Sequence, residues 1–275
     1  MSRQLPKRCL VIGDRVEHSL SPIIHNTGYR VLGIEKDYDY GAKRVTREEL
    51  STFIRDVRES NVRGLSVTMP HKEAVSKLLD TVDDVAAAIG AVNTIVALDG
   101  RLLGANTDWI GAVGPLLALG PLTGMRVAVI GAGGAARAFV YGLTREGANV
   151  TVYNRTAEKA KIIAQRFGCD AGDIEDSDAI TQADVICNTT AAGMNEDDDL
   201  PVSKNALQPH QVVFDAVYTP YQTKLLNTAQ SKGAKIIHGT EMLLHQGMAQ
   251  FALFTGQVAP EAAMRLALLT ATRNL

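Results

Sequence analysis

A strand that runs into a glycine-rich turn is the feature of this sequence that most constrains its fold. The stretch RVAVIGAGGAARAFVYGL (126–143) places an apolar, β-rich run before Gly131 and a helical pattern after Gly133. With Ala136 these glycines form G-x-G-x-x-A, in which the glycines permit a tight turn and a close approach to a pyrophosphate and the alanine keeps the helix near the sheet. The helix amino terminus favours phosphate charge. The context predicts a dinucleotide-binding unit, with a tight turn that holds no ligand as the alternative.

The end of the next predicted strand indicates which dinucleotide is bound. A site for NAD normally carries Asp or Glu about twenty residues after the glycines, where the acid binds the ribose 2′-hydroxyl. This chain has Asn154, Arg155 and Thr156 there. A guanidinium and a hydroxyl suit a 2′-phosphate, which a carboxylate would repel. We therefore predict NADP as the cofactor, although Arg155 taken alone is also compatible with an ordinary surface position.

Apolar β-rich runs alternate with helical patterns along the chain, which predicts the α/β class with largely parallel sheets covered by helices. The first series ends in a hairpin whose strands, 92–98 and 101–107, are joined by Asp99-Gly100. The residues from Thr240 onward are mostly helical by apolar spacing, and we expect them to return to the first domain. Further strands are expected at 9–13, 37–42, 62–68, 126–131, 149–154, 183–188, 211–217 and 234–239, and helices at about 22–32, 47–59, 108–119, 135–147 and 157–167.

A lysine, Lys72, follows a predicted strand end and a proline in SVTMPHKEA (66–74). The apolar spacing over 74–79 predicts a helix from near His71, which places Lys72 in its first turn. A cation is poorly placed there, because the amino terminus of a helix carries partial positive charge. Lys72 is therefore either an ordinary solvated lysine or a lysine set at the carboxyl end of a strand to do chemistry.

The composition is that of a globular protein with room for two domains. The chain has 275 residues, of which 46% are hydrophobic and 21% charged, and its formal net charge is −2. No basic stripe is visible, so neither nucleic acid nor an anionic membrane is expected as a partner. The apolar run near the amino terminus is too short for a signal-peptide core, and no run is long enough to span a membrane. We therefore expect a cytoplasmic protein.

Cysteine and histidine usage favours neither disulfides nor a metal site. Cys9, Cys169 and Cys187 lie far apart, in or near apolar stretches, which is typical of reduced cysteines in a cytosolic protein. The histidines show no metal-ligand spacing such as H-E-x-x-H. The acidic run NEDDD (195–199) is expected to be a solvated loop rather than a metal site. We predict no bound metal.

Short stretches in order along nearly the whole chain carry a family resemblance. They are HSLSPIIHN (18–26), SVTMPHKE (66–73), GAVNT (90–94), NTDWIG (106–111), GAGGAARA (131–138), NRT (154–156), DAVYTP (215–220) and GTEMLLHQ (239–246). Together they resemble the shikimate dehydrogenase family, which reduces 3-dehydroshikimate to shikimate with NADPH in the pathway to chorismate and the aromatic amino acids. The stretch CNTTAAGM (187–194) departs from the family pattern, so contacts of Thr189 and Thr190 with the cofactor are less certain.

The resemblance implies a division into domains. Residues 1–105 would form an α/β substrate-binding catalytic domain, and 106–239 a Rossmann-type NADP domain with a doubly wound parallel sheet. The helices of 240–275 would complete the first domain, with a cleft between the two. The only partner implied is a small-molecule substrate, and the protein is expected to be a monomer or a homodimer.

The resemblance also implies roles for individual residues, with Lys72 as the catalytic residue and Asp108 beside it as its partner in proton transfer and orientation. Ser21, however, stands before Pro22, which is equally typical of a helix N-cap followed by proline at the first helical position. Substrate contacts are implied for Ser19, Ser21, Thr68, Lys72, Asn93, Asp108, Tyr218 and Gln246, and cofactor contacts for Gly131, Ala132, Gly133, Gly134, Ala135, Asn154, Arg155, Thr156, Lys159, Val217 and Gly239.

The implied chemistry needs a proton donor, because hydride transfer to a ketone leaves an alkoxide. Lys72 can supply that proton. Two rival functions remain: a dehydrogenase of the same fold with broader substrate or cofactor use, such as one that acts on quinate, and a non-catalytic NADP-binding sensor. A sensor would be expected to lose the Lys72 and Asp108 pair before the glycines, and both residues are present.

Overall fold

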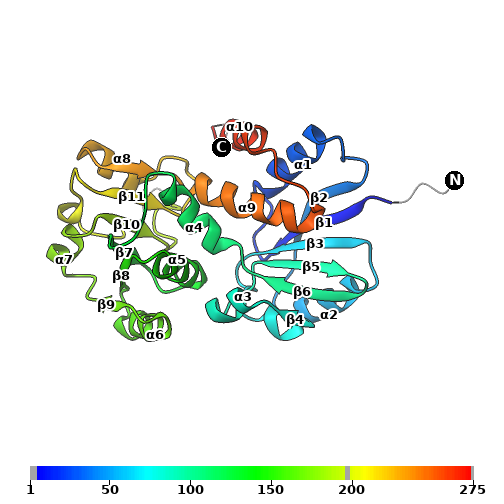
Figure 1. Ribbon diagram of the computed structural model, residues 1–275, viewed down its shortest axis with the longest axis horizontal. Coiled ribbons are helices and arrows are strands. Elements are labelled where there is room, and N and C mark those ends of the chain that lie inside the picture. Colours follow the sequence, from blue (N-terminus) through cyan, green and yellow to red (C-terminus); the bar gives the residue numbers. More distant parts are fainter. Residues whose placement is uncertain (1–4, 196–198, 274–275) are drawn as a thin grey trace. The chain divides into compact units, whose positions relative to one another are not determined.

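The computed structural model describes residues 5–195 and 199–273, which divide into two units. Unit 1 consists of the residues through Thr107 together with Gln246–Ala271, and unit 2 of Asp108–His245 and the residues from Thr272. Strands and helices alternate in each unit (Figure 1), so the predicted α/β class is confirmed. Part of the acidic run expected to form a solvated loop, 196–198, lies outside the described residues.

Unit 1 is built on a mixed sheet with the strand order β2-β1-β3-β5-β6-β4. β1 pairs in parallel with β2 and β3, while the hairpin β5-β6 supplies the antiparallel pairs. The hairpin turn is confirmed, because Asp99 and Gly100 have φ values of 50° and 74°. The elements are β1 (Lys7–Gly13), α1 (Ser21–Val31), β2 (Tyr38–Arg44), α2 (Leu50–Val57), β3 (Val62–Val67), the 3-10 helix η1 (Val75–Leu78), β4 (Thr81–Val82), α3 (Asp84–Ile89), β5 (Thr94–Leu98) and β6 (Arg101–Ala105).

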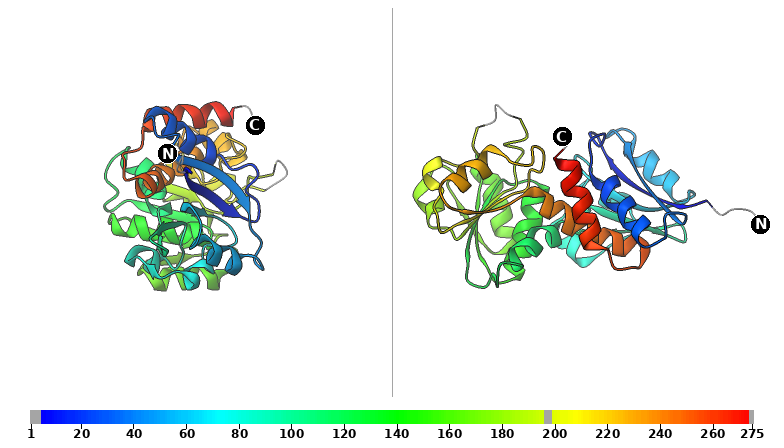
Figure 2. Two further views of the ribbon diagram at one scale, coloured as in Figure 1. Left: turned by 90° about the vertical axis from the view of Figure 1, so that its right-hand side faces the viewer. Right: turned by 90° about the horizontal axis from the view of Figure 1, so that it is seen from above.

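The C-terminal helices α9 (Gly239–Thr255) and α10 (Glu261–Thr272) complete the core of unit 1. Phe254 of α9 lies where a Cβ on Gly64 of β3 would stand. A Cβ on Gly28 of α1 would lie 2.6 Å from Phe251 and 3.3 Å from the sulfur of Met264. Glycine at these positions lets the elements approach closely, and α10 lies beside α1 in both views of Figure 2. The predicted return of the C-terminal helices to the first domain is confirmed.

A histidine, His25, is buried among aromatic rings in this core. Its ring stacks on Tyr40 with centroids 4.2 Å apart and lies beside Tyr29, Phe251 and Phe254. Within the described residues neither ring nitrogen has a hydrogen-bond partner. Burial among uncharged rings lowers the pKa of His25 from 6.5 to about 3, because the charged form loses its hydration.

This burial predicts a pH dependence of stability. In the unfolded chain His25 takes up a proton below about pH 6.5, while the folded state resists it, so the free energy of unfolding should fall as the pH drops. The contribution is about 1.4 kcal/mol per pH unit between the two pKa values. His25→Phe should remove this slope between pH 7 and 5 in urea unfolding. Tyr29→Phe, which changes a neighbouring buried ring, should keep it, and parallel curves for His25→Phe and the parent would contradict the argument.

Unit 2 is a parallel, doubly wound sheet in the order β12-β11-β10-β7-β8-β9. The predicted strands and helices are found within a few residues, whereas β9, α7 and α8 are elements that the apolar patterns did not predict. The elements are α4 (Asp108–Leu117), β7 (Arg126–Ile130), α5 (Gly134–Arg145), β8 (Asn149–Tyr153), α6 (Ala157–Phe167), β9 (Asp170–Gly172), α7 (Ser177–Thr181), β10 (Val185–Asn188), the 3-10 helix η2 (Lys204–Ala206), β11 (Val212–Asp215), α8 (Lys224–Ser231) and β12 (Lys235–Ile237).

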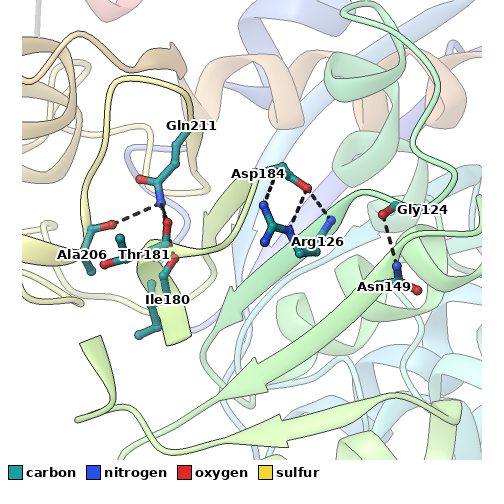
Figure 3. A network of polar contacts seen from close by, with 8 residues as sticks. All are labelled: Gly124, Arg126, Asn149, Ile180, Thr181, Asp184, Ala206 and Gln211. Atoms are coloured by element: carbon teal, nitrogen blue, oxygen red, sulfur yellow. Dashed lines mark hydrogen bonds and ion pairs between the residues drawn. The ribbon is translucent and has the colours of Figure 1, made fainter. Parts of the chain in front are cut away.

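Polar side chains tie together the amino ends of the unit 2 strands (Figure 3). Asp184, just before β10, accepts from the backbone N–H of Arg126 at 2.8 Å and from its guanidinium at 2.9 Å. The guanidinium lowers the pKa of the Asp184 carboxyl. Gln211, just before β11, donates to the carbonyl oxygens of Ile180, Thr181 and Ala206 at 3.1–3.3 Å. These hydrogen bonds hold the amino ends of the strands together. The carboxyl ends, on the opposite side of the sheet, remain available for ligands.

Several expectations from composition concern the cysteines, membrane-spanning helices and metal sites. Cys9 and Cys187 are buried, Cys169 is partly buried, and all three are free thiols. In the described part of the chain, no helix is both long and apolar enough to cross a membrane. Nor do three or more His, Cys, Asp or Glu side chains among these residues gather as metal ligands would.

Candidate active site

The turn after β7 is shaped so that only glycine fits at position 131. Gly131 has a φ of 117°, and its N–H donates to the carbonyl of Tyr153 at the end of β8. A Cβ there would lie 2.6 Å from Oγ1 of Thr189. That hydroxyl donates to the carbonyl of Ile130 at 2.7 Å. Thr189, whose contact with a cofactor the sequence left uncertain, therefore has a part in closing the turn.

The amino terminus of α5 is open in the way that phosphate binding requires. In the described chain its first turn carries neither an acidic side chain nor a side-chain cap. A Cβ on Gly133 or Gly134 would meet no described atom within 4 Å. Ala136 is fully buried in the core against the sheet, as the third position of the motif demands. Backbone N–H groups and the helix dipole are thus available to an anionic pyrophosphate, for which Ala132 and Ala135 complete the turn.

A hollow of about 540 Å³ lies at the end of β8, where a 2′-phosphate was predicted. Arg155 lines it and is exposed, so its guanidinium can turn toward a phosphate. Asn154 donates from Nδ2 to the carbonyl of Thr156 at 3.0 Å, which shapes the turn into α6. Lys159 is exposed on the first turns of that helix. The hollow is also lined by Asn154, Lys161, Gly172, Asp173 and Glu175.

A buried carboxylate that the sequence analysis did not single out joins the ends of β10 and β11. Asp215 accepts hydrogen bonds from Oγ1 of Thr223 at 2.6 Å, Nδ2 of Asn188 at 2.9 Å and the N–H of Val217 at 3.1 Å. Burial raises the pKa of its carboxyl, and the three donors oppose that rise. The stretch DAVYTP contains Asp215, but nothing in the pattern indicates that its carboxylate is buried.

The predicted cofactor residues Val217 and Gly239 lie against each other beside this carboxylate. A Cβ on Gly239 would stand 2.6 Å from the carbonyl carbon of Val217, so only glycine allows the approach. Tyr218 follows and is half-buried, and desolvation raises the pKa of its phenol, which keeps the hydroxyl as a neutral donor. Unit 2 therefore places the predicted cofactor residues beyond the carboxyl ends of β7, β8, β11 and β12.

In unit 1, the predicted substrate residues Ser19, Ser21 and Thr68 lie beyond the carboxyl ends of β1 and β3. Thr68 donates its N–H to Ile12 of β1 at 2.9 Å. Ser21 is the first residue of α1, and the N-cap is Leu20. The interpretation of Ser21 as an N-cap is therefore wrong by one residue. Instead, the hydroxyl of Ser19 accepts the N–H of Ser21 at 3.3 Å.

The predicted helix from near His71 is wrong, and Lys72 lies in a turn. Only the short η1 forms, from Val75 onward. The carbonyl of Lys72 accepts the N–H of Val92 at 2.7 Å, so it is not available to continue an α-helix. His71 is buried, and its Nε2 lies 2.7 Å from the carbonyl of Val45, a contact in which the ring donates. Backbone pairing and the buried ring together fix the turn that carries Lys72, which is itself partly buried.

Asn93 and Gln246 come together in unit 1, although they are far apart in the sequence. Nδ2 of Asn93 lies 3.4 Å from Oε1 of Gln246, and both side chains are buried. Oδ1 of Asn93 accepts the N–H of Thr107 at 2.7 Å. Thr107 is followed by Asp108, the first residue of α4 and of unit 2. Lys72 belongs to unit 1, so its pairing with Asp108 stays a prediction.

In unit 2 the carboxyl ends of the strands are open to a nucleotide, and unit 1 carries a set of hydroxyl and amide side chains. This combination defines the class of two-domain, nicotinamide-dependent dehydrogenases. Three family models match: "Shikimate dehydrogenase substrate binding domain" over residues 11–95, "Shikimate / quinate 5-dehydrogenase" over 117–217 and "Shikimate 5'-dehydrogenase C-terminal domain" over 239–269.

Curated and solved relatives agree with these matches. A shikimate dehydrogenase (NADP(+)) of Thermococcus kodakarensis is 43% identical, over 94% of either chain. The crystal structure of shikimate dehydrogenase from Aquifex aeolicus has a TM-score of 0.91 at 38% identity, covering 96% of this chain and 97% of that one. The Thermus thermophilus enzyme in complex with NADP(H) and shikimate has a TM-score of 0.89 at 36% identity, covering 98% and 100%. This chain belongs to the shikimate dehydrogenase family.

The buried carboxylate of Asp215 leads to a prediction about the cofactor edge, which is the set of carboxyl ends of the unit 2 strands. Asp215→Asn sets an amide NH₂ among three donors, and loss of a hydrogen bond to a charged group costs about 1.5–3 kcal/mol. We expect a lower melting temperature and weaker NADPH binding, measured by thermal unfolding and by fluorescence titration.

Asp184→Asn is the matched control, because Asp184 ties the opposite edge of the same sheet. It should lower the melting temperature and leave the dissociation constant for NADPH unchanged. Equal weakening of NADPH binding by both substitutions would contradict a local role of Asp215.

Proposed function

We propose that this protein catalyses the reversible reduction of 3-dehydroshikimate to shikimate with NADPH, a step in the formation of chorismate and the aromatic amino acids. The observation that carries the proposal is the likeness, over nearly the whole chain, to the Thermus thermophilus structure that holds NADP(H) and shikimate. Unit 1 binds the substrate and unit 2 the cofactor. Oxidation of shikimate with NADP, followed by absorbance of NADPH and compared with quinate and with NAD, tests it.

The residues at the end of β8 support NADP as the cofactor. No acid stands at positions 154–156, and Arg155 lines the hollow beside them. A guanidinium can form paired, charge-assisted hydrogen bonds to a phosphate. Thr156 and Lys159 add a hydroxyl and a second cation. The pyrophosphate is bound by Gly131, Ala132, Gly133, Gly134 and Ala135, and Asn154, Val217 and Gly239 complete the site.

The substrate side supplies hydrogen bonds and a proton. Ser19, Ser21, Thr68, Asn93, Tyr218 and Gln246 are hydroxyl and amide side chains, which suit a small polyhydroxylated carboxylate. NADPH, when bound, supplies the hydride. Lys72 then gives its ammonium proton to the alkoxide oxygen, and in the reverse direction its neutral amine takes the proton of the alcohol. Asp108 holds and orients the ammonium.

The proposal also covers the partners, location and oligomeric state of the protein. The near-neutral charge favours no nucleic acid or membrane partner, and the small-molecule substrate is the only partner proposed. We place the protein in the cytoplasm as a monomer or homodimer. Oxidation of quinate as fast as of shikimate would favour the rival with broader substrate use, and NADP binding without turnover would favour the sensor.

Lys72 is the residue on which the proposed chemistry depends most. Lys72→Ala should reduce kcat for shikimate oxidation by about 10²- to 10⁴-fold, the usual scale for a general acid-base group, with a far smaller change in KM. Asp108→Asn should also lower kcat. The double substitution should cost less than the sum of the single effects, because two residues that act as a unit are not additive.

Lys77→Ala is the control for this experiment, because Lys77 is an exposed lysine of η1, close to Lys72 in the sequence. It should leave kcat near the parental value. A parental kcat for Lys72→Ala, in protein whose circular dichroism shows the native fold, would make Lys72 a bystander. Strict additivity of Lys72→Ala and Asp108→Asn would refute their pairing.

Arg155 is expected to select NADP over NAD. Arg155→Ala should weaken NADP binding by about 1.5–3 kcal/mol, the contribution of a hydrogen bond to a charged group, and leave NAD binding almost unchanged. Arg166→Ala removes an exposed positive charge from the other end of α6 and should change neither affinity. Equal losses for NADP and NAD, in titrations of purified Arg155→Ala, would overturn this assignment.

A further inference from the structure

A chain of buried polar side chains runs through unit 1 to Asn93. The hydroxyl of Tyr40 lies 2.6 Å from Oγ of Ser66, which lies 2.6 Å from Oε1 of Gln250. Nε2 of Gln250 lies 3.0 Å from Oγ1 of Thr94, which lies 2.7 Å from Oδ1 of Asn93. None of the five side chains is more than 6% exposed. In such a dry interior every donor must meet an acceptor.

Two backbone groups fix which side chain donates and which accepts along this hydrogen-bonded series. The carbonyl of Asn93 can only accept, so the atom of Gln250 that faces it at 3.2 Å is the amide nitrogen. Oε1 of Gln250 therefore faces Ser66, whose hydroxyl must donate to it, and Tyr40 in turn donates to Ser66. On the other side Gln250 donates to Thr94. The proton of the Thr94 hydroxyl is thereby directed to Oδ1 of Asn93.

The second backbone group is the N–H of Thr107, which can only donate and lies 2.7 Å from the same Oδ1 of Asn93. Both donors occupy the amide oxygen. Nδ2 of Asn93 consequently points the other way, where it donates to Oγ1 of Thr107 at 3.0 Å and lies 3.4 Å from Oε1 of Gln246. Nδ2 of Asn93 is thus a donor next to an acceptor, Oε1 of Gln246, and the distance between them is longer than that of a usual hydrogen bond.

We propose that Thr94 and Gln250 are positioning residues that, together with Thr107, hold the Asn93 amide with its NH₂ toward the substrate. The pair formed by Asn93 and Gln246 then recognises a hydroxyl group, because a hydroxyl can accept from Nδ2 and donate to Oε1 at once. A carbonyl can only accept and an ammonium can only donate. The inference rests on the proposed function, in which Asn93 and Gln246 contact the substrate.

The test compares two substitutions at one position. Thr94→Val keeps the shape but removes one of the two donors at Oδ1 of Asn93, so the amide is held less firmly. We expect KM for shikimate to rise about 3- to 10-fold, the worth of one hydrogen bond, with kcat and the KM for NADP little changed. Thr94→Ser keeps the hydroxyl and should restore the parental KM. Tyr29→Phe, which removes a buried hydroxyl outside the network, should leave KM unchanged. Equal KM values for Thr94→Val and Thr94→Ser would overturn the proposal.

A second variant keeps the test decisive if Thr94→Val does not fold. Gln250→Glu replaces the donor that faces Thr94 by a carboxylate, which draws the threonine hydroxyl away from Asn93. Protonation of that carboxyl restores a donor, so the ratio of KM for Gln250→Glu to the parental KM should fall toward one as the pH is lowered. A merely structural role predicts a ratio that does not vary with pH, and this result would refute the proposal.

Two further measurements separate this inference from the proposed function. If the parent protein does not oxidise shikimate with NADP, the proposed function falls and the inference falls with it. If the parent is active and Asn93→Ala raises KM for shikimate while neither Thr94→Val nor Gln250→Glu does, only the positioning role is overturned. A rise of KM in all three variants, with recovery in Thr94→Ser, supports both.

Discussion

The buried carboxylate of Asp215 is the interaction on which the cofactor edge depends. A carboxylate placed in the interior loses its hydration, and only hydrogen bonds can offset that loss. The donors come from the end of β10, the end of β11 and the start of α8, so they must stay in place together. The spacing of these strand ends sets where Thr189 meets Gly131 and where Val217 meets Gly239. Ties at the amino ends of the strands, through Asp184 and Gln211, close the other edge. The apolar core between the two edges supports the sheet but does not by itself fix the position of either end.

In unit 1, buried hydrogen bonds orient an amide side chain rather than hold strand ends together. Apolar packing can place an amide side chain, but it cannot decide which end is oxygen and which is nitrogen, because the two ends have nearly the same size. Groups with a single hydrogen-bonding role make that decision. In unit 1 these are the carbonyl of Asn93 and the N–H of Thr107, and the buried network of Tyr40, Ser66, Gln250 and Thr94 carries their polarity. Its members come from β2, β3, β5 and α9, so the return of the C-terminal helix contributes to the polarity of the site as well as to the core.

The sequence predicted the parts of the fold that have strong periodicity or turn chemistry. Strand β7, its glycine turn and the hairpin at Asp99-Gly100 were all predicted, because local residues alone determine them. Strands β4 and β9 were missed because two or three residues show no alternation. The helix near His71 was wrongly predicted, since the apolar spacing after Lys72 does not reveal that Val92 takes the carbonyl of Lys72. Residues in family stretches could be assigned roles by resemblance. The network to Asn93 could not, because Ser66 and Gln250 are separated by 184 positions and neither lies in a pattern that indicates a hydrogen bond.

Because Lys72 lies in a turn and not in the predicted helix, its electrostatic surroundings favour the proposed chemistry more than that helix would. In the first turn of an α-helix the ammonium would face unpaired N–H groups and the positive end of the dipole, which disfavours a cation. In the observed turn the Lys72 carbonyl is paired with Val92, and η1, which begins at Val75, is too short to build a large dipole. The backbone is nevertheless fixed, because the His71 ring is buried and donates to Val45. The turn therefore offers the rigidity of a helix start without its repulsion of a cation, which suits the role proposed for Lys72.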